Sequence, residues 1–138
     1  MNLVEQQNAL VEFYGEPVSV YTRAQAIEDG YLVDISSIAK ECGFRYPVAI
    51  TSDVFGDCVY LAKDDEKMVL ETQLERTENL LRELMKAIKR TDRSVDRITF
   101  ALEYAHVEGC AVRDGSAKLT SVVGPGDTLD PVITISRA

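Results

Sequence analysis

The sequence has few of the residues that form disulfide bonds or hold a metal. It contains one histidine, His106, and three cysteines, Cys42, Cys58 and Cys110, without a C-x-x-C pair. Three widely spaced cysteines do not suit a disulfide framework, and they favour reduced thiols in a cytoplasmic protein. The alternative is a zinc site built from the cysteines and His106. Because buried small thiols explain the pattern more simply, we expect no metal and no cofactor.

Long hydrophobic runs are also missing. No apolar run approaches the roughly 18 residues that a membrane helix needs. The first segment carries Glu5 and Glu12 and lacks the basic region of a secretory signal. We therefore expect no membrane partner and a cytoplasmic location.

The length predicts one domain over residues 1–138. A chain of 138 residues with 46% hydrophobic residues is long enough to bury about two thirds of its unfolded surface. Its composition is that of a folded protein and excludes global disorder.

The net charge is −8, from 15 basic and 23 acidic side chains. A phosphate backbone repels such a chain, so we expect no non-specific nucleic-acid binding. The charge is uneven: residues 1–81 hold 6 basic and 15 acidic side chains, and residues 82–138 hold 9 and 8. A local basic stretch either stabilises the end of a helix by interacting with its dipole or forms a small anion or partner site. It contains Arg82, Lys86, Lys89, Arg90, Arg93 and Arg97.

Glycines and hydroxyl residues punctuate the first sixty residues and predict short helices. Thr22 and Gln25 have capping-box spacing ahead of a helix over 23–29, and Gly30 suits its left-handed end. The other predicted elements here are a helix over 2–14, a strand-like run over 18–21, an extended run over 31–35, a helix over 38–42 capped by Ser36 or Ser37 and closed by Gly43, and a helix after Thr51 or Ser52.

A single long amphipathic helix is predicted over residues 66–90. Its apolar stripe has a heptad-like spacing, with one threonine inside it. Such a stripe packs against the sheet of its own chain or pairs with a second copy, so a homodimer through this helix is the alternative. The stripe consists of Leu70, Leu74, Thr77, Leu81, Leu84 and Ile88.

After residue 95 the apolar period changes to two, which is typical of a half-buried strand. We expect a strand over 97–107, a turn at 113–116, a strand over 118–123, a loop at 124–127 and a strand over 131–136. The sequence therefore predicts an α+β fold. It would combine short N-terminal helices, one long amphipathic helix and a C-terminal antiparallel β-meander of about three strands.

Three separated segments resemble a family of small uncharacterised proteins carried by bacterial plasmids and phages. They read VYTRAQAIEDGYLVDIS at 20–36, AKECGFRYPVAIT at 39–51 and KLTSVVGPGDTLDPVITI at 118–135. The resemblance implies a small accessory protein that binds and blocks a host system or sequesters a signal molecule. Because the family has no established activity, the resemblance carries no catalytic residues over to this chain.

Catalytic patterns are weak. The Gly124–Asp127 loop lacks the context of a phosphate-binding loop and is better explained as a turn. A triad would need His106 as its base. Tyr21 and Thr22, with Glu103 on a later strand, have a layout similar to that of ADP-ribosyltransferase-like folds. A nucleotide-binding or ADP-ribosyltransferase-like enzyme is therefore the alternative function.

The expected function is a non-enzymatic binding protein of a mobile genetic element. Its partner would be a host protein complex, and inhibition of a host defence complex through an acidic surface is the leading hypothesis. Aromatic residues and arginines near the resembling segments are typical of interface centres. The predicted partner-binding residues are Tyr21, Arg23, Glu28, Asp29, Asp34, Arg45 and Tyr46.

Overall fold

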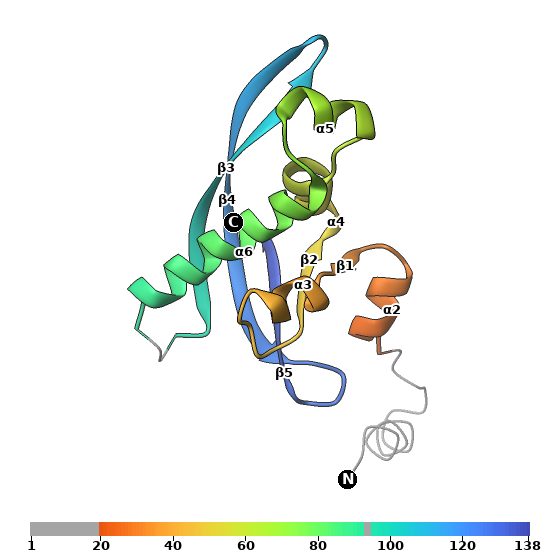
Figure 1. Cartoon of the computed structure of the whole chain (residues 1–138). Helices are drawn as coiled ribbons and strands as arrows, with labels where there is room; N and C mark the ends of the chain where they lie inside the picture. The colour runs from red at the N-terminus through yellow and green to blue at the C-terminus, as the bar shows by residue number, and fades with distance from the viewer. Residues whose placement is uncertain (1–19, 93–94) are drawn as a thin grey trace.

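A computed structural model describes residues 20–92 and 95–138 (Figure 1). The predicted helix over 2–14 and the first part of the strand-like run over 18–21 lie outside these residues, and Val20 and Tyr21 are not in a strand. The elements are α2 (Arg23–Glu28), β1 (Leu32–Asp34), α3 (Ser36–Glu41), β2 (Val48–Thr51), α4 (Ser52–Val54), the π-helix η1 (Phe55–Val59), α5 (Lys63–Val69), α6 (Gln73–Arg90), β3 (Arg97–Glu108), β4 (Ala111–Pro125) and β5 (Pro131–Arg137).

One five-stranded mixed sheet, in the order β1-β2-β5-β4-β3, organises the fold. The antiparallel meander β3–β4–β5 confirms the predicted C-terminal strands. Strand β2 was not predicted; it pairs parallel to β5 and antiparallel to β1. Its residues Val48, Ala49 and Ile50 are fully buried, so this short apolar run is a central strand. Figure 1 shows α6 crossing the face of the sheet, with β3 at one edge and β1 at the other.

The β3–β4 hairpin is longer than predicted. Its turn is Gly109 and Cys110, and the expected turn at 113–116 lies inside β4. Gly115 pairs with Tyr104, and a Cβ at Gly115 would lie 2.8 Å from Cε2 of that tyrosine. The prediction was wrong because this glycine makes room for an aromatic ring and does not form a turn.

The predicted helix over 66–90 is two helices, α5 and α6. Leu70 ends α5 in a left-handed conformation, with φ of 57°, and is 87% exposed. Thr72 begins α6 by accepting a hydrogen bond from the Glu75 amide at 3.1 Å. This threonine cap starts a new helix, and the heptad spacing cannot reveal it.

The core between α6 and the sheet confirms part of the predicted stripe. Leu81 and Leu84 are fully buried, and Ile88 packs against the same core. The prediction was wrong for Leu70 and for Leu74, which is 50% exposed. Leu80, which is also fully buried, was missed. The core that α6 covers on the sheet includes Phe100, Leu102, Leu119, Ile133 and Ile135.

The N-terminal helices follow the predicted caps only in part. The capping box of Thr22 and Gln25 is present, and Gly30 is left-handed with φ of 83°. Helix α3 begins earlier than predicted, and neither Ser36 nor Ser37 is its N-cap. No helix in the described part of the chain is long and apolar enough to cross a membrane.

Candidate functional site

The N-terminal and C-terminal segments that carry the family resemblance meet in space. The Asp127 carboxylate accepts hydrogen bonds from the backbone N–H groups of Arg23 at 2.8 Å and Ala24 at 2.9 Å. The bonds from Ala24 and then Arg23 lower the pKa of Asp127. The predicted loop at 124–127 is wrong for Gly124 and Pro125, which lie in β4 and pair with β5. Asp127, in the turn between β4 and β5, ties that turn to the start of α2.

Arg23 fastens the same helix to the sheet. Its guanidinium donates to Oγ1 of Thr134 at 2.6 Å and to the Ile133 carbonyl at 2.8 Å. Burial lowers the pKa of Arg23, while the nearby Asp34 and Asp127 oppose that effect. Arg23 was predicted to bind a partner. The structure shows that its side chain positions α2, and its role toward a partner remains a prediction.

Two exposed tyrosines and two acids form a surface at the β1 edge, which we name the acidic tyrosine face: Tyr21, Glu28, Asp29 and Tyr31. The Tyr21 hydroxyl donates to Oδ2 of Asp29 at 2.7 Å, which is the main reason that the pKa of Tyr21 rises to about 12. The rings of Tyr21 and Tyr31 meet edge to face, with centroids 6.4 Å apart. Tyr21 is 57% exposed and Tyr31 is 65% exposed. Tyr31 was not among the predicted partner-binding residues, although it directly follows Gly30, the predicted end of the helix.

Asp34 has a local structural task in addition to its exposed position. Its Oδ1 accepts from the Ser36 amide at 3.0 Å and from the Ser36 hydroxyl at 2.5 Å. These bonds hold the start of α3, so a substitution of Asp34 would disturb local structure as well as surface charge.

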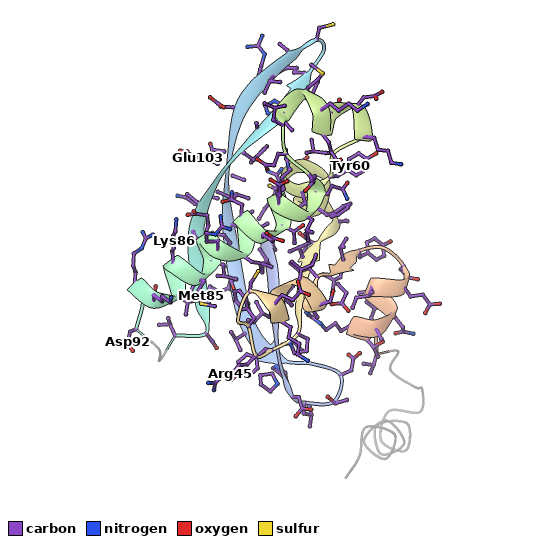
Figure 2. The ribbon with its side chains drawn as sticks, viewed as in Figure 1. Arg45, Tyr60, Met85, Lys86, Asp92 and Glu103 are labelled. Atoms are coloured by element: carbon purple, nitrogen blue, oxygen red, sulfur yellow. The ribbon has the colours of Figure 1, made fainter. Side chains whose placement is uncertain are left out.

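Arg45 and Tyr46 lie on a different surface from the acidic tyrosine face. They border an open groove of about 490 Å³ between the loop before β2, the C-terminal part of α6 and the sheet. Figure 2 shows Arg45 below Met85, and Asp92 also lines the groove. The apolar lining residues are Phe44, Met85, Ile88, Val95, Ile98, Val123 and Ile133. The structure thus divides the predicted residues between two surfaces.

The residues of the enzyme alternative do not form one site. Thr22 is used in the capping box of α2, which joins the β1 side of the sheet. Glu103 lies on β3, at the opposite edge. Nε2 of His106 lies 3.8 Å from Oε2 of Glu108, and the buried Nδ1 of His106 has no hydrogen-bond partner within the described part of the chain. Among residues 20–92 and 95–138, no three metal-ligating side chains gather in one place.

Arg76 is a buried cation that the sequence reasoning missed. It is 3% exposed, donates from Nε to the Cys58 carbonyl at 3.0 Å, and also donates to the Ala105 carbonyl. Its guanidinium carbon lies 5.5 Å from the centroid of the Tyr104 ring. Burial lowers the pKa of Arg76. The sequence could have indicated this burial, because Arg76 is next to Thr77 and four residues before Leu80, and both of these residues are buried.

Comparison with known proteins places the chain in a family. It is similar to an Escherichia coli protein named "Type I restriction enzyme EcoAI endonuclease subunit", with 31% identity over 106 residues. The match covers 70% of this chain but only 13% of that protein. No solved structure matches the chain. A family model described as "Family of unknown function (DUF6573)" matches residues 11–137, and the chain belongs to this family.

Proposed function

We propose that the chain is a non-enzymatic binding protein of a mobile genetic element and engages a host protein complex through the acidic tyrosine face. The observation that carries this proposal is the exposed pair Tyr21 and Tyr31, with Asp29 hydrogen-bonded to one of them. These side chains are held in place although they lie at the surface.

A preformed aromatic and acidic face suits protein recognition. Tyrosine supplies a large contact area at a small cost in conformational entropy, and it is enriched where interfaces bind most strongly. The hydrogen bond between Tyr21 and Asp29 reduces the ordering that binding requires. The adjacent Glu28 adds negative charge, which favours a basic partner surface and raises the association rate.

Inhibition of a host defence complex is the specific form of this proposal. A basic surface that contacts nucleic acid would attract the carboxylates of the face. A purified type I restriction complex, as a host defence complex that acts on nucleic acid, is the first partner to test.

The test reverses the charge of the face while sparing Asp34. The double variant Glu28→Lys with Asp29→Lys should slow association with the immobilised complex about tenfold and flatten its salt dependence. The matched control is Glu41→Lys with Asp114→Lys, which changes the net charge equally at exposed positions elsewhere. Equal association rates and salt slopes for the two variants would contradict the role of the face.

A turnover assay separates binding from the enzyme alternative. The purified chain is incubated with NAD, and the nucleotide is quantified over time. We expect no consumption. Consumption by the wild-type chain that Glu103→Gln abolishes would replace the binding proposal with the enzyme.

A further inference from the structure

Strand β3 lies at an edge of the sheet and pairs on that side with no other strand of the described residues, and its outward groups can be assigned from one hydrogen bond. The Val123 amide donates to the Asp96 carbonyl at 2.8 Å, in line with the β3–β4 register. Because antiparallel bonding alternates along a strand, even-numbered residues of β3 bond to β4 and odd-numbered residues direct their N–H and C=O groups outward. The Ala105 carbonyl follows this rule, since it accepts from Arg76 on α6.

The outward groups of Arg97, Thr99, Ala101 and Glu103 have no backbone partner among the described residues. All four side chains are exposed. Beyond them, Arg76 occupies the next outward carbonyl and ends the free stretch. The edge available to another strand is therefore residues 97–103.

The two ends of this edge carry opposite charge. Arg97 stands at the start, on the side where α6 ends in Lys89 and Arg90. At the other end, Glu103 lines a hollow with Glu71 and Asp114. Figure 2 shows Lys86 on the part of α6 that crosses β3 and Glu103 farther along the strand. A strand that pairs here meets a cation at one end and carboxylates at the other.

The position of α6 decides between a second copy and a single extended segment. In Figure 1 the C-terminal turns of α6 cross in front of β3 and extend past the edge of the sheet. A two-fold pairing of two β3 edges would put both helices on the same face, each extending into the space of the other. A single extended segment brings no helix of its own, so it fits beside β3 under the C-terminal turns of α6.

We propose that β3 binds an extended segment of a partner protein by antiparallel strand addition over residues 97–103. The segment carries a cation opposite Glu103 and, six residues later, a carboxylate opposite Arg97. Small or β-branched residues lie opposite Ala101 and Thr99, and the intervening side chains are apolar and face α6. Main-chain hydrogen bonds supply affinity, and the end charges set direction and register. This edge lies opposite the acidic tyrosine face, so the inference stands apart from the proposed function.

The probe is a labelled peptide, acetyl-Lys-Val-Thr-Val-Thr-Val-Glu-amide, measured by fluorescence anisotropy with the full chain. We expect it to bind about tenfold more tightly than the peptide with lysine and glutamate exchanged, because both end pairs change from attraction to repulsion. Equal or reversed preference would overturn the proposed direction.

A charge exchange in the protein tests the same register without changing net charge. The variant Arg97→Glu with Glu103→Arg should invert the preference between the two peptides. The matched control is Arg113→Glu with Glu108→Arg, which exchanges an ion pair of 3.5 Å near the hairpin turn, outside the free edge. An unchanged preference in the edge variant, or inversion in the control, would contradict the assignment.

Amide hydrogen exchange measures the protection of each backbone amide along the edge, independently of charge. In the free chain, the amides of Thr99 and Ala101 should exchange rapidly, and those of Phe100 and Leu102 slowly. The peptide should slow exchange at Thr99 and Ala101. Binding without this added protection would show that the peptide occupies another surface and would overturn the proposal.

Discussion

Asp127 accepts a hydrogen bond from the backbone N–H of Arg23 at 2.8 Å, although 104 positions separate the two residues. The same carboxylate binds the next amide, and the Arg23 side chain reaches β5. These bonds join the start of α2 to the loop after β4. The resembling segments at 20–36 and 118–135 are therefore joined, and together they support the acidic tyrosine face.

Replacing Asp127 with Asn should lower the Tm by a few degrees in thermal unfolding followed by circular dichroism. An amide can accept from one of the two N–H groups but turns a donor toward the other. The control is Asp130→Asn in the same loop, whose carboxylate accepts only a 3.3 Å bond from Thr128 among the described contacts. Equal shifts for the two variants would show that the link to α2 is unimportant for stability.

The Asp127 link also predicts a direction of pH dependence. The folded-state pKa of Asp127 is lowered, so its stabilising contribution is present above the ordinary carboxyl pKa of about 4. That contribution is lost as the pH falls through the lower folded-state value. The Tm difference between wild type and Asp127→Asn should therefore be constant near pH 7 and shrink in acid. A difference that grows in acid would be the opposite of this expectation.

Tyr21 should titrate with a pKa of about 12, because its hydroxyl donates to Asp29 and the carboxylate opposes loss of the proton. Ultraviolet difference absorbance of the phenolate can follow this titration, with Tyr21→Phe identifying the signal. The Asp29→Asn variant should bring the pKa of Tyr21 back toward the ordinary value of about 10. An unchanged titration would mean that the bond is not maintained in solution.

Two leucines that share the predicted stripe should respond differently to substitution. Leu81 is fully buried, so Leu81→Ala should reduce the free energy of unfolding by about 2–5 kcal/mol in urea. Leu70 is exposed and left-handed, so Leu70→Gly should leave stability unchanged or raise it by up to about 1 kcal/mol. Comparable losses at both positions would indicate one continuous helix through residue 70.

Gly115 and Gly124 provide a matched pair within β4. A Cβ at Gly115 would press on the Tyr104 ring, so Gly115→Ala should reduce the free energy of unfolding by about 1–3 kcal/mol. Nothing lies within 4 Å of a Cβ at Gly124, so Gly124→Ala should change it by less than about 0.5 kcal/mol. Urea unfolding of both variants checks the prediction. Equal costs would show that the Tyr104 ring moves aside and that a glycine at position 115 is not required to make room for it.

Local patterns determined the elements whose signals lie within a few residues. Thr22 and Gln25 predicted the start of α2, Gly30 its end, and the alternation after residue 95 the strand β3. The predictions for α2 succeeded because residues at its own ends satisfy the backbone groups concerned. The prediction of β3 succeeded because its side chains alternate between the core and the exposed face of the sheet. The α+β class with a C-terminal meander followed from the change of apolar period.

Contacts between distant segments decided the rest. The run at Val48 became a central strand because β5 pairs with it, and Gly115 lies inside a strand because the ring of Tyr104 is opposite. Arg23 and Asp127 look like surface charges in the sequence, yet their bonds to each other's segments hold α2 in place. The sequence by itself determined the bounds of α2, the strands of the C-terminal meander and the charge distribution. Only the tertiary structure decided the strand neighbours, the position of β3 at an edge of the described sheet and the division of the predicted partner-binding residues between two surfaces, because these depend on which distant residues satisfy one another's hydrogen bonds and apolar surfaces.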